Sequence, residues 1–223
     1  TGMAGFPKCP DWKFAVESLD APRRTIRVSY PCCGICGTLP TFKNMGASHQ
    51  AVNVYDLEPK YERILKELLG QNATLHLGKV HGDIMRVKDF EKLEVCEMLC
   101  AGPPCPPRAG KGHKKSTGDI RSTVFCKVLQ MIVFFIKSGV LNAAMIENVA
   151  GIGKAFGNCE SFLDAVMNTL NEHCPEFAWT YHELRNMDYR LPQEHTRLFV
   201  RGVRKSIADR VPEPLQSFGP RHI

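Results

Sequence analysis

The sequence lacks a long uninterrupted apolar segment, which excludes several classes of protein. Its longest apolar run, Val128 to Ile136, is interrupted by Gln130, whereas a membrane-spanning helix needs about 20 apolar residues. Residues 1–10 also lack the charged and apolar regions of a secretory signal peptide. We therefore expect an intracellular protein without a membrane partner, located in the nucleus if its source is a eukaryote.

The sequence also lacks the regular cysteine spacing of a disulfide-stapled scaffold, although it contains ten cysteines. Cys96, Cys100 and Cys126 lie inside apolar runs, where a thiol behaves as a small buried hydrophobe. We therefore expect reduced thiols. The net charge of +6 is compatible with a nucleic-acid partner but does not by itself indicate one.

Short apolar segments alternate with helical patterns along most of the chain. This alternation predicts an α/β fold, with a mostly parallel twisted sheet and helices on both faces. We expect an irregular lead-in at 1–25, one domain at 26–207 and an extended tail at 208–223. The expected strands are 26–31, 51–55, 74–80, 95–101, 142–147, 177–183 and 197–203, and the expected helices are 38–46, 59–69, 122–138 and 159–172.

Three weak motifs follow the first three strands, at the edge where such sheets bind ligands. Gly34-Ile35-Cys36-Gly37 permits a tight turn and close approach of a ligand to the backbone. Asp56 ends the second strand, where a carboxylate can accept hydrogen bonds from ribose hydroxyls, and the neighbouring Leu57 can pack on an adenine ring. Gly82-Asp83-Ile84 follows the third strand and offers an acceptor for an adenine amino group. No phosphate-binding lysine pattern accompanies them, which favours a nucleoside without a polyphosphate.

Each of these motifs also has a purely structural interpretation. The glycine turn is an ordinary strand-to-helix loop, and Asp56 and Glu58 suit the N-terminus of the helix that follows. Asp83 suits a turn that is capped by its own side chain. Only the order of the motifs, each after a strand, favours a binding site.

Two further residues have properties expected of catalytic groups. Cys105 lies between two prolines after an apolar strand, and the basic loop at 102–121 would favour its thiolate, which is the nucleophilic form. Glu147 ends another apolar strand, where a carboxylate is costly unless it is paired or used. The alternatives are an inert loop cysteine and a capping carboxylate.

Taken together, these segments resemble the cytosine-C5 DNA methyltransferase family. Gly102-Pro103-Pro104-Cys105 matches its nucleophile motif, and Glu147-Asn148-Val149 matches its Glu-Asn-Val motif. The segment from Gln193 to Arg197 resembles its Gln-x-Arg-x-Arg motif. The resemblance covers residues 28–204 and implies a Rossmann-like class I methyltransferase fold, so that 26–207 is the S-adenosylmethionine-dependent catalytic domain. The family's target-recognition region and final motif have no counterpart in residues 208–223.

The resemblance implies methyl transfer from S-adenosylmethionine to C5 of a cytosine that is flipped out of DNA. Cys105 would attack C6, Glu147 would hydrogen-bond N3, Asn148 would position the loop, and Arg197 would bind near the cytosine O2 or the flipped phosphate. The residues implied to bind the methyl donor are Cys33, Gly34, Ile35, Gly37, Asp56, Leu57, Asp83, Ile84, Pro104 and Val124. Those implied to contact backbone phosphates are Lys111, Lys114, Lys115, Arg201 and Arg204.

The sequence departs from the family pattern at four positions. Cys36 stands where the family usually has glycine, and Cys32 where it often has an aromatic residue. Pro106 replaces the usual glutamine after the nucleophile. His195 replaces the first arginine of the Gln-x-Arg-x-Arg motif and supplies a charge that depends on pH.

Three alternative functions remain open at this point. A zinc-binding interaction module could use Cys32, Cys33 and Cys36 with Cys9 or His49. A second ligand pair at the usual spacing is missing, so we expect no metal site. A catalytically impaired methyltransferase-like protein could bind the donor, DNA or a protein partner. An RNA cytosine-C5 methyltransferase could use the same two motifs.

Overall fold

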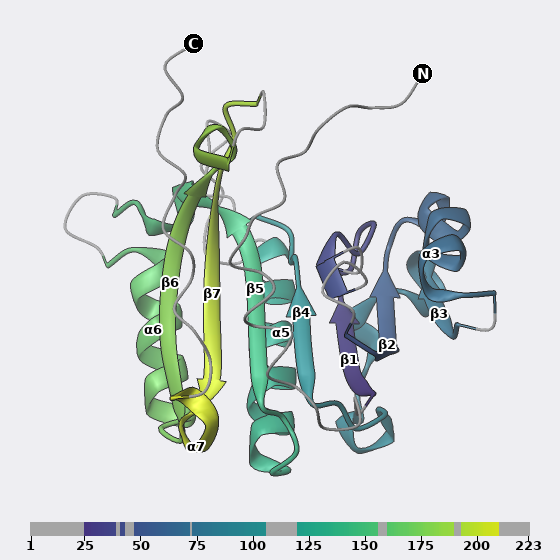
Figure 1. Cartoon of the computed structure of the whole chain (residues 1–223), viewed down its shortest axis with the longest axis horizontal. Coiled ribbons are helices and arrows are strands. Elements are labelled where there is room, and N and C mark those ends of the chain that lie inside the picture. Colours follow the sequence, from purple (N-terminus) through teal and green to yellow (C-terminus); the bar gives the residue numbers. More distant parts are fainter. Residues whose placement is uncertain are drawn as a thin grey trace.

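One twisted sheet forms the framework of the computed structural model, which describes residues 25–38, 41–42, 47–71, 73–105, 120–155, 160–189 and 193–209 (Figure 1). The strands are β1 (Ile26–Pro31), β2 (His49–Asp56), β3 (Leu75–Leu77), β4 (Met98–Ala101), β5 (Ala143–Val149), β6 (Phe177–Arg185) and β7 (Thr196–Arg204). The helices are α3 (Glu62–Leu69), α4 (Gly78–His81), α5 (Ile120–Lys137), α6 (Phe162–His173) and α7 (Lys205–Ala208). Short 3-10 turns are η1 (Pro59–Tyr61), η2 (Ile84–Arg86), η3 (Phe90–Lys92), η4 (Ala150–Gly153) and η5 (Asn186–Tyr189).

The strand order in the described part of the chain is β3-β2-β1-β4-β5-β7-β6. Strands β1 to β5 pair in parallel, and β7 runs antiparallel to both β5 and β6. The mostly parallel sheet predicted from the sequence is therefore confirmed. The chain leaves β1 toward β2 and returns to β4 on the other side, so the order reverses between β1 and β4. Open α/β sheets bind ligands at such a reversal, beside the carboxyl ends of the strands.

Helices cover both faces of the sheet, as expected. Helices α5 and α6 lie behind β4 to β6 in Figure 1 and bury Phe125, Ile132 and Leu170 against one face. Helix α3 places Leu65 against Val28 on the other face. The two apolar clusters stabilise the sheet from opposite sides and leave the carboxyl ends of its strands available for ligands.

The start of α6 shows how the sequence sets an element boundary. Ser161 and Asp164 form a capping box, in which each side chain accepts a hydrogen bond from the backbone N–H of the other, at 3.0 and 3.3 Å. Leu163, Val166 and Leu170 then recur at helical spacing and are buried. The helix predicted at 159–172 is present with a start that is set by this cap.

The strand predicted at 74–80 is wrong beyond Leu77. Gly78 has a φ of +78°, which turns the chain out of the sheet and into the short helix α4. The Gly82 N–H donates to the Gly78 carbonyl oxygen at 2.7 Å and closes this helix. The predicted helix at 38–46 is described only at 38 and 41–42, which are helical. The lead-in, most of the basic loop and the end of the tail lie outside the described residues.

Candidate active site

The turn after β1 is held against the end of β2. Gly34 has a φ of +53°, a conformation that glycine adopts without steric cost. The Cys33 N–H donates to the Tyr55 carbonyl oxygen at 3.0 Å, and the Cys36 N–H donates to the Cys33 carbonyl oxygen at 2.8 Å. The expected tight turn is therefore present and opens at the reversal between β1 and β4.

Asp56 accepts hydrogen bonds from two backbone N–H groups. Its Oδ2 accepts a hydrogen bond from the Gly34 N–H at 2.7 Å, and its Oδ1 accepts one from the Glu58 N–H at 2.9 Å. The carboxylate thus organises both the glycine turn and the start of the segment that leads to α3. Each oxygen has further lone-pair capacity, so these bonds leave room for ligand hydroxyls.

Gly82 allows the loop after β3 to lie directly against Asp56. A Cβ atom at Gly82 would be 1.9 Å from the Asp56 carbonyl oxygen, so only glycine fits there. The neighbouring Asp83 accepts a hydrogen bond from the Met85 N–H at 3.0 Å. The self-capped turn considered for Asp83 is therefore present, and it fixes the carboxylate beside the end of β2.

The remaining predicted donor residues fall into two groups. Ile35 and Leu57 expose 52% and 49% of their surface although both are large and apolar, and their contact with a donor remains a prediction. Ile84 and Val124 are buried in the core cluster on the α5 face, and their contact with a donor remains a prediction.

The nucleophile loop, by which we mean residues 102–105 with the predicted nucleophile Cys105, is bonded to the end of the adjacent strand β5. Strands β4 and β5 pair in parallel with Ala101 opposite Ile146, so the residues after Ala101 lie beside the end of β5. The Asn148 side chain, only 2% exposed, donates from Nδ2 to the Pro103 carbonyl oxygen at 3.0 Å. Its Oδ1 accepts from the Val149 N–H at 2.9 Å. Asn148 therefore fixes the backbone before Cys105.

Glu147 is paired with an arginine from β7. The Arg197 Nε lies 2.8 Å from Glu147 Oε1, and the two side chains are 37% and 39% exposed. The antiparallel register places Arg197 opposite Val149, which brings the two side chains to the same end of the sheet. Oε2 lies over Gly102, 3.5 Å from the position that a Cβ atom would occupy there. Arg197 thus orients the carboxylate toward the nucleophile loop.

Cys105 lies just beyond the segment that Asn148 holds. Its side chain is partly buried, and the preceding Pro104 is exposed. Since two residues span at most about 7 Å of extended chain, the Cys105 backbone is confined close to Pro103. The two predicted catalytic motifs therefore meet at neighbouring strand ends.

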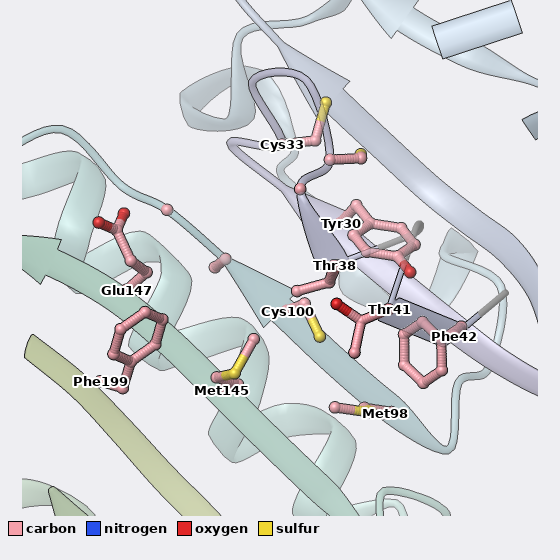
Figure 2. A pocket seen from close by; sticks show the side chains of 14 residues that line it. Tyr30, Cys33, Thr38, Thr41, Phe42, Met98, Cys100, Met145, Glu147 and Phe199 are labelled. Carbon is pink, nitrogen blue, oxygen red and sulfur yellow. The ribbon is translucent and has the colours of Figure 1, made fainter. Parts of the chain in front are cut away.

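A cavity of about 680 Å³ connects the glycine turn with Glu147 (Figure 2). Its lining residues are Tyr30, Cys33, Cys36, Gly37, Thr38, Thr41, Phe42, Met98, Cys100, Ala101, Gly102, Met145, Glu147 and Phe199. Cys33, Gly37 and Glu147 were predicted from the sequence. Glu147 lines the cavity, whereas Cys105 is not among the described residues that line it, so this cavity does not bring together the two side chains that would act on one cytosine.

The apolar residues that form the floor of this cavity were not predicted from the sequence. Met98 and Cys100 alternate along β4, and Met145 and Glu147 alternate along β5, so that all four face the same side. This period of two is a signal that the sequence contains. It was not informative because buried parallel strands are apolar on both faces.

Burial keeps two thiols near the site protonated. It raises the pKa of Cys32 to about 12, and the Asp56 carboxylate contributes to the increase. It likewise raises the pKa of Cys100 to about 12. Neither thiol therefore supplies a thiolate at neutral pH.

The structure bears on Arg204, which was predicted to contact phosphate, and on the zinc-binding alternative. Arg204 donates from Nε and Nη2 to the Leu141 carbonyl oxygen at 3.0 and 2.7 Å, and its guanidinium lies 5.2 Å from the centre of the Phe177 ring. Arg204 is thus held by the protein at the opposite end of β7 from Arg197, and its phosphate contact remains a prediction. Within the described ranges, no three His, Cys, Asp or Glu side chains are grouped to hold a metal ion.

The predicted lysine contacts at 111, 114 and 115 lie outside the described residues. None of the described helices is long and apolar enough to cross a bilayer.

Comparison with known proteins identifies the family of this chain. The model of the C-5 cytosine-specific DNA methylase family matches residues 31–220. This chain belongs to the C-5 cytosine-specific DNA methylase family. It is 27% identical over 160 residues to the type II methyltransferase M.HhaI of Haemophilus parahaemolyticus, covering 71% of this chain and 46% of that protein. It is also 27% identical over 131 residues to M.HgiCI of Herpetosiphon aurantiacus, covering 56% and 27% of the two chains.

A solved methyltransferase structure has a fold similar to that of this chain. The chain resembles the Dnmt2 methyltransferase of S. pombe with a TM-score of 0.63 at 18% identity, over 86% of this chain and 52% of that one. The methylase chain thus spans about half or less of the length of the relatives that it matches. The likeness to Dnmt2 concerns the Rossmann-like fold.

Proposed function

We propose that this chain transfers a methyl group from S-adenosylmethionine to C5 of a cytosine in DNA through a covalent adduct with Cys105. The observation that carries the proposal is the hydrogen bond from Asn148 to the Pro103 carbonyl oxygen. This bond holds the nucleophile loop beside the Glu147 carboxylate. The family to which the chain belongs supports the same reaction.

The residues around the glycine turn suit the methyl donor. Asp56 has acceptor capacity for ribose hydroxyls, and Asp83 offers a carboxylate for the adenine amino group. The half-exposed Leu57 and Ile35 offer apolar contact to the purine ring. Cys33 and Gly37 line the cavity beside the turn, and Gly34 and Pro104 follow the ends of β1 and β4. Ile84 and Val124 are buried in the core cluster on the α5 face. When bound, the donor supplies an electrophilic methyl group.

The chain's own residues would carry the remaining chemistry. The Cys105 thiolate forms a bond to C6 of the cytosine, which makes C5 nucleophilic. Because cytosine N3 is a hydrogen-bond acceptor, Glu147 would act in its carboxylic-acid form and donate to N3, which stabilises the negative charge that develops on the ring. After C5 has gained the methyl group it loses its proton, and the bond between C6 and sulfur breaks to regenerate Cys105.

Arg197 acts in this proposal as a positioning residue for Glu147. Its Nε holds Oε1 at 2.8 Å, so Oε2 remains directed toward Gly102 and the nucleophile loop. The cytosine O2 or the flipped phosphate would then meet the rest of the guanidinium. Because a base inside the duplex cannot reach this position, the target cytosine is flipped out. A DNA substrate implies an intracellular location, in the nucleus for a eukaryotic cell.

A trapping experiment tests the proposal. The chain is incubated with labelled S-adenosylmethionine and duplex DNA that contains 5-fluorocytosine, whose C5 cannot lose a proton. We expect an adduct that survives denaturation, disappears in Cys105→Ala and persists in Cys126→Ala, since Cys126 is an exposed thiol on α5.

Three outcomes would overturn parts of the proposal. An adduct that persists in Cys105→Ala would remove Cys105 as the nucleophile. Donor binding without any adduct would favour a catalytically impaired binding protein. Adduct formation with fluorocytosine-substituted tRNA but not with duplex DNA would identify an RNA methyltransferase.

A further inference from the structure

Cys33 and Cys36 lie at the two ends of the turn after β1. The Cys36 N–H donates to the Cys33 carbonyl oxygen at 2.8 Å. A turn closed by this bond brings the first and fourth α-carbons within about 7 Å. Disulfides join α-carbons that are about 4.4–6.8 Å apart, so the turn places the two cysteines within bonding range.

Both thiols point to the same side of the chain. Cys33 and Cys36 belong to the apolar cluster on the α3 face and line the cavity described above. Cys32, in contrast, packs against the cluster on the α5 face. Its position on the other side of the sheet removes Cys32 as a bonding partner for its neighbour.

Cys100 is the remaining competitor, because it lines the same cavity as Cys36. It lies on β4, below Tyr30 in Figure 2, whereas Cys33 lies on the turn above it. The hydrogen bond at 2.8 Å joins the backbones of Cys36 and Cys33. In the described turn, no backbone hydrogen bond to Cys100 does the same. Because only two residues separate Cys33 from Cys36, closing this loop costs less entropy than pairing either thiol with Cys100.

We propose that Cys33 and Cys36 form a reversible intramolecular disulfide that closes the turn between β1 and β4. The sequence Cys-x-x-Cys suits such exchange because its two thiols are close without backbone rearrangement. The turn is also where this chain departs from its family, with cysteine in place of glycine at position 36.

The oxidant is a glutathione-type disulfide, and the exchange balances in two steps. The Cys33 thiolate attacks one sulfur of oxidised glutathione, forming a mixed disulfide and releasing one reduced glutathione. The Cys36 thiol then loses its proton and displaces the second glutathione, leaving a bond between the two protein sulfurs. Two protein thiols are oxidised, and one glutathione disulfide is reduced to two thiols.

The order of these steps follows from the surroundings of the two thiols. Cys36 is 2% exposed, whereas Cys33 is only partly buried, so the oxidant reaches Cys33 first. A hydrogen bond with the Cys33 thiol, together with burial, raises the pKa of Cys36. The reduced form thus gains no stabilisation from a Cys36 thiolate, and stabilisation of the reduced form is what makes some disulfides strongly oxidising.

Closing the disulfide would change the donor site, a consequence that rests on the proposed function. The Cys33 Sγ contacts the Gly34 carbonyl oxygen at 3.4 Å in the reduced turn, and the Gly34 N–H donates to Asp56. A sulfur–sulfur bond of about 2.05 Å requires the Cys33 side chain to leave that contact. We therefore expect the turn to shift relative to Asp56, and the affinity for S-adenosylmethionine to fall by about tenfold.

To test the proposal, the full chain is equilibrated in glutathione buffers in which the reduced fraction decreases stepwise. Free thiols are then alkylated in denaturant, and disulfides are mapped by mass spectrometry. We expect one bond between 33 and 36, formed reversibly, present in Cys126→Ser and Cys100→Ser and absent in Cys36→Gly. Glycine suits the φ of +50° at position 36, so this variant retains the fold, as circular dichroism would verify.

Other results would overturn the pairing. These are a bond between 36 and 100, a stable glutathione adduct at Cys33, or free thiols at both positions in the most oxidising buffer. Donor titration of the reduced and oxidised chain separates the two proposals. If the reduced chain fails to bind the donor, the proposed function fails, whereas the mapping still tests the disulfide. If oxidation leaves the donor affinity of a binding-competent chain unchanged, the effect on the donor site is wrong.

Discussion

The buried side-chain amide of Asn148 at the end of β5 donates a hydrogen bond of 3.0 Å to the carbonyl oxygen of Pro103 in the loop after β4. Proline lacks a backbone N–H, so a Pro-Pro segment cannot be held by the usual strand ladder. The asparagine side chain provides the missing connection. It links two motifs that are distant in the sequence and holds the loop that leads to Cys105 against the end of β5.

Replacing Asn148 with alanine should therefore destabilise the chain. The change leaves the Pro103 carbonyl oxygen and the Val149 N–H without their partner, which costs about 1–3 kcal/mol. Urea denaturation measures the free energy of unfolding. Asn171→Ala is the control, because this exposed side chain bonds only to its own helix at Met167 and should change stability by about 0.5 kcal/mol or less. Equal losses in both variants would contradict the proposed link.

Arg197→Ala should reduce adduct formation far more than stability. Both partners of the ion pair with Glu147 are more than one-third exposed, so its loss should cost less than about 1 kcal/mol. A misplaced carboxylate should slow adduct formation by about 100-fold. The rate of trapping on fluorocytosine DNA checks this.

Arg185→Ala is the matched control for Arg197→Ala. Arg185 also pairs with a carboxylate, that of Asp188 at 3.0 Å, but the pair lies in an exposed segment at the end of β6. We expect an unchanged trapping rate. A similar loss in both variants would indicate that Arg197 acts through the overall charge of the chain.

Gly82→Ala should weaken both the fold and donor binding. Its methyl group would overlap the Asp56 carbonyl oxygen, so the backbone at the end of β2 must move, at a cost of about 1–3 kcal/mol. Thermal denaturation and donor titration measure the two effects. Gly153→Ala is the control, because the nearest atom would be a Leu163 methyl carbon at an ordinary 3.5 Å. Unchanged donor affinity in Gly82→Ala would show that the position of Asp56 does not govern binding.

His76 should make stability depend on pH in the mildly acidic range. Burial, with repulsion from His81, lowers the pKa of His76, whose ring stacks on Tyr55 at 4.5 Å. The unfolded chain therefore takes up a proton at higher pH than the folded chain, so stability falls as pH drops below about 6.5. His76→Phe keeps the stacking and should flatten this dependence.

Urea midpoints at pH 5.5 and 7.5 measure the effect of His76. The difference between the two midpoints should shrink in His76→Phe and remain in His173→Phe, which alters an exposed histidine at the end of α6. An equal shift in both variants would assign the pH dependence to other groups.

The sequence alone determined the class of fold and pointed to the two motifs that we propose to be catalytic. Strands such as β1 and β5 and the helix α6 were predictable because their signals are local: an apolar run, a recurring helical face, a capping pair. The motifs around Cys105 and Glu147 were predictable for the same reason, since each is contiguous and follows a strand. The strand that ends at Leu77 was extended too far because the conformation of Gly78 is not visible in an apolar pattern.

Only the tertiary structure decided how these pieces meet. The antiparallel register of β7 on β5 brings Arg197 to Glu147 and carries Arg204 to the other end of the sheet, although both arginines belong to one strand. The contact of Gly82 with Asp56 and the bond from Asn148 to Pro103 likewise join segments from different strands. Local sequence fixes which residues can form strands and turns. Pairing and register depend on packing across the whole sheet, and they set the distances on which the chemistry depends.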